Sequence, residues 1–591
     1  MTLPPLANLF AVHDEDPATL AAIEADLQAS GEFAEVWRPA AGWVAAAAPL
    51  PRGEPDGREV RSAGLAFAEG RDVVGQDFGA VAQLADHTPE RLASVPGDFG
   101  FIHFRPHGGA TVVRSCGGLV PFYLWRSDGR TGVATRLGDF VRYLPEELAL
   151  DPLVNAIWAS GRTLFPNGRT FLAGVHIIAR GVFAKLERGG RCAARSYWDP
   201  RPSYLAPPTA SCAREHAERL RALLVHKLTR DLDPEGGNLL TLSGGVDSSS
   251  LAALAVGMLG RKVWTWTLLP DQEDEFQREM SYVAPLVSQF HIERTWSLRV
   301  RERTRVELLY AAPQVAFHVM HPALCALPGI VREAPVRVLF SGEFADEVCG
   351  SDHTWPDWAV DVSVPQLLAG VGRRRSVRDG LRWTKRRLLS VMGRPTLPWP
   401  EHLAGFTRPE LQEEYRDWLD GRRRAAARDR APRRYLALRA EEDGFVTMNW
   451  EAASALAVRR SFPFFNREVL ELAFECHPIE LVTPGTKKLL RAAVRNDVPA
   501  WNLDRPDKGH WGAYLRAVRI PWDTPLPEVF ETVLRPEWCP RPPKLLDVWE
   551  ASALAQLLVF LNSLRTRRRE RRLTAADTPG MFRPKEGVPH R

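Results

Sequence analysis

Two segments of the sequence end an apolar run with residues that can bind phosphate and metal ions. The first is LLTLSGGVDSSS at 239–250, a pattern typical of a buried strand, a glycine turn and the start of a helix. Glycines let the backbone turn sharply and approach a ligand, and helix N-termini attract anions. A carboxylate here would repel phosphate unless a hard cation such as Mg2+ lay between them. We therefore expect the following residues to bind a nucleotide and Mg2+: Leu242, Ser243, Gly244, Gly245, Asp247 and Ser248.

The second segment, VRVLFSGEFADEVCGS at 336–351, repeats the order of apolar strand, Ser-Gly turn and acidic helix start. Ser341 and Gly342 form the turn, where a residue without a side chain lets the backbone come close to phosphate. Asp346 is the expected partner of Asp247. Two carboxylates together with phosphate oxygens and waters complete an octahedral Mg2+ site.

The spacing excludes a Walker A loop, because the pattern GxxxxGKS/T is absent. The string SGGVDS instead resembles the pyrophosphate loop of the N-type ATP pyrophosphatases, and SGEFADE resembles the second signature of the asparagine synthetase family. The resemblance implies that ATP is split into AMP and pyrophosphate. It also implies roles for three more residues. The Leu268 backbone would touch adenine, Glu343 would face the reacting carbonyl, and Lys508 would neutralise phosphate charge. Lys487 and Lys488 are expected on a helix surface.

Residues 1–205 contain short β-type runs that are broken by Gly, Pro and Asp. Among them, GDFGFIHF and VVRSCGGLVPFYLW resemble the class II glutamine amidotransferase domain of asparagine synthetases. The resemblance implies an α/β protein of two units. A degenerate, Ntn-type α+β amidotransferase domain at 1–205 would precede an α/β pyrophosphate-loop synthetase domain with added helices at 206–565. The basic tail at 566–591 is expected to be disordered.

The first part departs from the family where glutamine would be hydrolysed. Glutaminases of this family use a cysteine at position 2, where this sequence has Thr2. The Asn-Gly segment of the oxyanion hole and the acidic glutamine-binding motif are also absent between Ala63 and Pro96. An N-terminal threonine is a nucleophile in related hydrolases. Without the supporting motifs, however, we expect a scaffold domain that lacks glutaminase activity.

Composition narrows the class of protein further. The 591 residues are 45% hydrophobic and 25% charged, and the net charge of +5 does not by itself imply nucleic acid. The start of the sequence lacks a basic region followed by an apolar core, and no apolar run reaches about 18 residues, so we expect a cytoplasmic protein without a secretory signal or a membrane span. The 7 cysteines include no CxxC pair. This pattern fits thiols in a reducing compartment and argues against a zinc site.

The stretch 352–435 diverges from the family and is rich in Arg, Trp and Tyr. This combination suits contacts with the phosphates and bases of nucleic acid. The charges nevertheless recur with apolar residues at helical spacing, which favours solvated helix faces. A basic, aromatic-lined groove for a peptide is the alternative, and we expect no nucleic acid.

Three families share the architecture implied by these motifs: asparagine synthetases, β-lactam synthetases and lasso peptide cyclases. Lasso cyclases join an Asp or Glu side-chain carboxylate of a precursor peptide to the same peptide's N-terminal amine. The missing nucleophile disfavours the first family, and the SGEFADEVCGS and TWPDW stretch resembles lasso cyclases more than β-lactam synthetases. We therefore expect a macrolactam-forming ligase that uses ATP and Mg2+, with a leader-binding protein and a leader peptidase as partners. A small amino-acid substrate is the alternative, and an ATP-binding scaffold or a tRNA-modifying enzyme also stays open.

Overall fold

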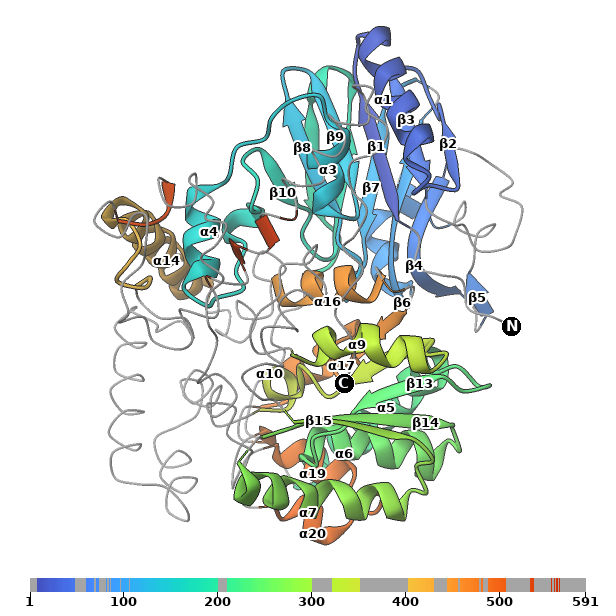
Figure 1. Cartoon of the computed structure of the whole chain (residues 1–591). Coiled ribbons are helices and arrows are strands. Elements are labelled where there is room, and N and C mark those ends of the chain that lie inside the picture. Colours follow the sequence, from blue (N-terminus) through green and yellow to red (C-terminus); the bar gives the residue numbers. More distant parts are fainter. Residues whose placement is uncertain are drawn as a thin grey trace, which may run out of the picture.

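The described part of the chain forms three β-sheets flanked by helices (Figure 1). Thr2, Lys508, the basic tail and most of the 352–435 stretch lie outside it. The computed structural model describes, with short gaps, residues 8–47, 60–73, 81–199, 210–299, 322–350, 402–429, 444–505, 532–535 and a few positions between 554 and 563.

The first half consists of two six-stranded antiparallel sheets that share a core. One sheet has the order β10-β8-β9-β1-β3-β2, and the other has the order β12-β11-β7-β6-β4-β5. Successive side chains of a strand point to opposite faces. Leu9 of β1 therefore joins the core shared with Phe104 of the second sheet, whereas Phe10 faces the helices α1, α3 and α4. The bounds are β1 (Leu9–His13), β2 (Glu35–Trp37), β3 (Trp43–Ala47), β4 (Val60–Ala68), β5 (Arg71–Val73), β6 (Gly97–Phe104), β7 (Ala110–Arg114), β8 (Tyr123–Ser127), β9 (Arg130–Ala134), β10 (Val175–Ile177), β11 (Val182–Leu186), β12 (Cys192–Ser196), α1 (Pro17–Ser30), α3 (Leu137–Tyr143) and α4 (Pro152–Ala159).

The second half is built on a five-stranded parallel sheet with the order β15-β14-β13-β16-β17. The chain leaves β13 towards β14 on one side and returns to β16 on the other side. Open α/β sheets bind ligands at such a switch point, beyond the carboxyl ends of the strands. The bounds are β13 (Asn238–Thr241), β14 (Val263–Leu269), β15 (Thr295–Arg299), β16 (Val338–Ser341) and β17 (Arg459–Ser461).

Helices cover the parallel sheet and supply most of its core. Leu220, Leu224 and Leu228 of α5 are buried at a helical spacing. The helix α6 continues as a π-helical turn, Ala253–Met258, whose first residues are buried as the apolar run predicts. The bounds are α5 (Ala210–Asp231), α6 (Val246–Ala252), α7 (Glu273–Gln289), α9 (Pro322–Glu333), α10 (Ala345–Cys349), α14 (Pro409–Asp429), α16 (Gly444–Ser454), α17 (Arg467–Glu475), α19 (Lys488–Ala493) and α20 (Ala500–Leu503).

The described portion of the divergent stretch is dominated by the helix α14. Leu411, Tyr415 and Leu419 recur every four residues and are buried, and α14 packs beside α4 (Figure 1). The guanidinium of Arg162 lies 5.7 Å from the centre of the Tyr415 ring. This part of the stretch is therefore a helix with one apolar face packed on the first half.

The two halves meet through buried polar contacts around α5 and α16. Lys227 of α5 lies 2.6 Å from Asp98 of β6 and 3.1 Å from Asp231. Tyr123 of β8 donates its hydroxyl to Glu451 of α16 at 2.8 Å, and Figure 1 shows α16 between the antiparallel and parallel sheets. A lysine with two carboxylates keeps each buried charge paired, as burial requires.

The expected mixed α/β fold with a parallel sheet is confirmed. The domain boundaries and the amidotransferase ancestry of the first half stay predictions. None of the described helices has both the length and the apolar character that a bilayer-spanning segment needs.

Candidate functional site

The first loop joins β13 to α6 and contains most of the residues expected to bind phosphate. Gly244 has a φ of 68°, and a Cβ there would lie 2.8 Å from the Cβ of Tyr282, so only glycine suits the position. The Ser243 N–H donates to the Ser248 Oγ at 3.1 Å, and the two serine hydroxyls are 3.2 Å apart. The loop is thus closed by serine hydroxyls, with Asp247 in the first turn of α6.

Leu242 and Leu268 lie at the carboxyl ends of neighbouring strands. The Leu242 N–H donates to the Trp266 carbonyl at 2.8 Å, and the Leu242 carbonyl accepts from the Thr267 hydroxyl at 2.8 Å. Both leucine side chains are buried. The Leu268 backbone therefore stands at the same edge of the sheet as the first loop, and its contact with adenine stays a prediction.

The second loop joins β16 to α10 and packs directly against the first. A Cβ on Gly342 would lie 2.7 Å from the Cβ of Asp247 and 3.0 Å from the Ser248 nitrogen. Such distances are too short for any residue with a side chain. Glycine at 342 is therefore what allows the two loops to approach each other.

Aromatic packing holds the turn that follows Gly342. Phe344 has a φ of 68°, which is unusual for a residue with a Cβ. Its ring stacks on Phe465 with 4.0 Å between centroids and meets Phe462 edge-on at 5.0 Å. This packing offsets the cost of the left-handed backbone, which is roughly 1–2 kcal/mol. It also sets the direction of α10 and the position of Asp346.

The carboxylates of Asp247 and Asp346 meet at a lysine. Lys487 Nζ contacts Asp247 Oδ2 and lies 2.9 Å from Asp346 Oδ1. Its side chain is only 6% exposed, so the predicted surface position is wrong for Lys487, whereas Lys488 is exposed as expected. Burial alone would lower the pKa of Lys487, but the two carboxylates outweigh it and raise the pKa above its ordinary value. One buried cation therefore joins the two loops.

Glu343 is held by an arginine from the adjacent strand. Arg460 of β17 donates to Glu343 Oε2 at 3.1 Å, to Ser341 Oγ at 2.7 Å and to Asn449 Oδ1 at 3.1 Å. Burial lowers the pKa of Arg460, and the charge of Glu343 partly counteracts this. Arg460 thereby orients both side chains at the end of β16, and the Ser341 hydroxyl can still donate its own proton.

The helix α20 and the residues directly after it contact the backbone of the first loop. Asn502 of α20 donates to the Gly244 carbonyl at 2.8 Å. Arg505 forms a two-pronged ion pair with Glu279 at 2.8 and 2.9 Å and lies 4.0 Å from the centre of the Tyr282 ring. These contacts tie the loop to α7 and α20 and fix its backbone.

Residues 219–577 match the protein family described as asparagine synthase. The match covers more than half of the chain and contains both loops. This chain belongs to the asparagine synthase family. Its relatives include proteins named "Putative asparagine synthetase (glutamine-hydrolyzing)" from Mycobacterium bovis and Mycobacterium tuberculosis, which are 24% identical to it over 434 residues. The match covers 67% of this chain and 64% of the relatives, so it spans less than two thirds of their length.

Two solved structures that match the chain are only weakly similar to it. The NMN synthetase of Francisella tularensis is 14% identical, with a TM-score of 0.19, and covers 32% of this chain and 98% of its own. The glutamine phosphoribosylpyrophosphate amidotransferase of B. subtilis is 10% identical, with a TM-score of 0.24, and covers 50% and 91%. Similarity at this level assigns no function.

Two residues of this site, Lys487 and Arg460, were not among those predicted from the sequence. The signal for Lys487 was the Pro-Gly pair at 484–485, which puts the lysine before a helix rather than on its exposed face. The signal for Arg460 was a charged residue directly before the apolar run SFPFF. Lys508 lies outside the described residues, so its role stays a prediction.

The described residues fit ATP phosphates and Mg2+. Asp247 and Asp346 reach one common cation, Lys487, and carboxylate oxygens are the ligands that Mg2+ prefers. The two loops add serine hydroxyls and two glycines at positions that admit no side chain. These residues would hold the phosphates and the metal.

Proposed function

We propose that this chain is an ATP-dependent amide ligase that forms a macrolactam in a precursor peptide, as lasso peptide cyclases do. The observation that carries the proposal is that Asp247, Asp346 and Lys487 meet beyond the ends of β13 and β16. This is the point where the strand order of the parallel sheet reverses. Fixed charges and donors at such a place stabilise the charge that develops during phosphate transfer. Membership in the asparagine synthase family supports an ATP-using ligase.

The proposed reaction has two steps and produces AMP and pyrophosphate. A side-chain carboxylate of an Asp or Glu in the peptide attacks the α-phosphorus of ATP, and the bond to pyrophosphate breaks. The peptide's N-terminal amine then attacks the activated carbonyl, loses a proton and displaces AMP. In total, the peptide loses one water. The oxygen of that water is the carboxylate oxygen that attacked phosphorus, and it leaves as part of AMP.

The residues of the first and second loops have separate roles in this proposal. Ser243, Ser248 and the loop amides would hold the pyrophosphate portion of ATP. Asp247 and Asp346 would hold Mg2+, which supplies positive charge to the phosphate oxygens when bound. Lys487, which contacts both carboxylates, would place a further positive charge beside the metal and help to neutralise the negative charge of the leaving pyrophosphate.

The remaining residues would position the peptide and the nucleotide. Glu343 would face the activated carbonyl, and its contact with Arg460 favours an orienting role because the arginine restricts its direction. The backbone of Leu268 would contact adenine. Lys508 is proposed to neutralise charge on the α-phosphate and on pyrophosphate.

The choice of a peptide substrate is supported by sequence similarity. The SGEFADEVCGS and TWPDW segments resemble lasso cyclases more than β-lactam synthetases. A leader-binding protein and a leader peptidase are proposed as partners on the same basis. If the first half lacks glutaminase activity, the amine comes from the peptide itself.

Mass spectrometry tests this proposal. A candidate precursor peptide is incubated with the full chain, a leader peptidase, a leader-binding protein, ATP and Mg2+. We expect the core peptide to lose one water while AMP forms, and Asp247→Asn to abolish both. Asp274→Asn, an exposed carboxylate on α7, is the matched control and should change neither. An unchanged peptide, with AMP formed instead from aspartate or a small amino-acid derivative, would refute the macrolactam reaction.

A further inference from the structure

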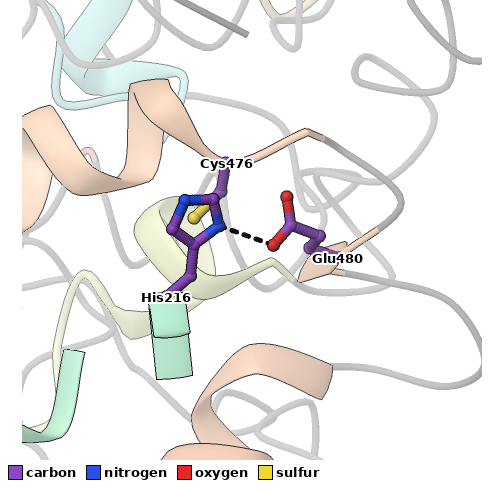
Figure 2. Close-up of side chains that lie close together, drawn as sticks. All are labelled: His216, Cys476 and Glu480. Carbon is purple, nitrogen blue, oxygen red and sulfur yellow. Dashed lines mark hydrogen bonds and ion pairs between the residues drawn. The ribbon is translucent and has the colours of Figure 1, made fainter. Parts of the chain in front are cut away.

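A second cluster of metal-binding side chains lies between α5 and the segment that follows α17. Ligand atoms of His216, Cys476 and Glu480 all lie within 4.8 Å of one another. Figure 2 shows the His216 imidazole facing both the Cys476 sulfur and the Glu480 carboxylate. The three residues are 9%, 0% and 3% exposed, so the cluster is enclosed by protein. None of them takes part in the site proposed for ATP.

We propose that this cluster binds a structural Zn2+ ion. Zinc prefers a mixture of thiolate, imidazole and carboxylate ligands, whereas Mg2+ prefers oxygen alone. Tetrahedral zinc with ordinary bond lengths separates its ligand atoms by roughly 3.3–3.8 Å. His216 Nδ1 and Glu480 Oε2 are 2.7 Å apart, so they would separate by about 0.6 Å to admit the ion.

Cys212 supplies the fourth ligand in this proposal. It lies one helical turn before His216 on α5, and its sulfur is 4.0 Å from His216 Nδ1 and 3.7 Å from Nε2. To bind the same ion, it would have to move towards the group formed by His216, Cys476 and Glu480. The ligands then form two pairs, each spaced by four residues: Cys212 with His216, and Cys476 with Glu480. This spacing contains no CxxC, which is why the cysteine pattern argued against zinc in the sequence.

The surroundings of the cluster suit a metal site. Glu480 Oε1 accepts a hydrogen bond from the His477 N–H at 2.9 Å, which orients the carboxylate and leaves Oε2 directed at His216. Outer hydrogen bonds of this kind fix metal ligands in place. Cys212 is only half-buried, so an ion could reach the cluster from the side on which this residue lies.

Two other interpretations fit less well. A Cys-His-Glu group can act as a nucleophilic triad, but a fully buried Cys476 leaves no room for a substrate. If His216 and Glu480 only formed a structural hydrogen bond, the nearby thiols of Cys476 and Cys212 would have no role. The convergence of Cys476 and Cys212 on the same imidazole therefore favours a metal.

The proposed ion would hold together parts of the chain that are far apart in sequence. His216 and Glu480 are separated by 264 positions, and metal binding to such a site contributes directly to folding free energy. The segment that leaves Glu480 leads to Lys487, which joins the two loops of the nucleotide site. Zinc would thus anchor the chain shortly before this lysine.

Metal analysis of the purified full chain tests the proposal without any activity assay. We expect about one Zn2+ per chain, and at least a tenfold loss of zinc affinity in Cys476→Ser and in Glu480→Gln. Cys192→Ser, a cysteine on β12 away from the cluster, should keep the metal. Asp247→Asn should keep it as well, which separates this site from the one proposed for Mg2+. A chain that binds no Zn2+, or a Cys476→Ser variant that binds it normally, would overturn the proposal.

Cobalt substitution identifies the ligands. Co2+ bound by thiolates gives a charge-transfer absorption that we expect at full strength in the wild type and in Cys192→Ser, and clearly weakened in Cys476→Ser, where Cys212 would be the one thiolate left. Cys212→Ser should weaken the band, and an unchanged band would remove Cys212 from the ligand set. A chelator should lower the melting temperature of the wild type and added Zn2+ should restore it. An identical shift in Glu480→Gln would contradict the site.

Discussion

Lys487 Nζ lies 2.9 Å from Asp346 Oδ1 and joins the segment before α19 to the first turn of α10, which follows β16. The same ammonium contacts Asp247 in the first turn of α6, which follows the loop after β13. Two strands of the sheet and a distant helix are thus connected by one buried cation. The ligase proposed for this chain depends on that connection, because it brings the carboxylates to a common point.

Replacing Lys487 by methionine should impair both stability and activity. Removal of one member of a buried ion pair leaves uncompensated charge and costs about 3–5 kcal/mol. Urea denaturation should show this loss, and pyrophosphate release should fall by roughly two orders of magnitude. Lys488→Met is the matched control, since Lys488 is exposed and should change stability by less than about 0.5 kcal/mol. Equal stability of Lys487→Met and wild type would contradict the ion pairs.

Gly342→Ala should disturb the contact between the two loops. The added Cβ would lie 2.7 Å from the Cβ of Asp247, so the loops must move apart. We expect about 1–3 kcal/mol of destabilisation and a lower rate of pyrophosphate release. Gly329→Ala in α9 meets no atom within 4 Å and should be neutral or stabilising by up to about 1 kcal/mol. A Gly342→Ala enzyme with wild-type rate and stability would show that the loops are not in contact.

Glu451 should make folding stability depend on pH. Burial raises its pKa to about 7, and this outweighs the hydrogen bond from Tyr123. Between the unfolded pKa of 4.5 and about 7, the folded state holds a proton that the unfolded state has lost. The stability contributed by Glu451 is therefore present below pH 4.5 and is lost as the pH rises through 7, by about 3 kcal/mol in total.

Urea denaturation of Glu451→Gln at pH 5 and pH 8 measures this contribution. The amide can still accept the hydrogen bond from Tyr123 but does not titrate, so the variant should lose about 2 kcal/mol less than the wild type over this interval. Glu218→Gln, an exposed carboxylate on α5, should follow the wild type. Parallel curves for wild type and Glu451→Gln would show that Glu451 is ionised in the folded protein.

Asn502→Ala should weaken nucleotide binding more than folding. It removes the hydrogen bond to the Gly244 carbonyl, which contributes about 1 kcal/mol to stability. The loop proposed to bind phosphate then loses this support, so the KM for ATP should rise several-fold. Asp504→Ala, an exposed neighbour, should leave the KM unchanged. An unchanged KM in Asn502→Ala would mean that α20 does not position the loop.

Much of the fold around the site was predictable because its signals are local. The strands β13, β14 and β16 are apolar runs, and glycine turns follow β13 and β16, so short-range backbone preferences reveal them. The buried face of α14 also follows from its spacing. Lys487 was misplaced because lysine followed by an apolar run is typical of an exposed helix position, and its partners lie on distant strands.

Arg460 and Glu480 illustrate the same limit. Arg460 reaches Glu343 only because β17 pairs with β16, and Glu480 reaches His216 across 264 positions. No local pattern encodes these neighbours. They follow from the order of the strands and the packing of α5 against α17.

The sequence by itself determined the two loops, their glycines and the carboxylates that they carry. Backbone sterics and hydrophobic periodicity act over a few residues, and a single chain displays them directly. Only the tertiary structure decided which cation joins Asp247 to Asp346, which arginine orients Glu343, and which thiols surround His216. Those pairings depend on how distant segments bury their apolar surfaces together, and burial is also what makes each charge require a partner.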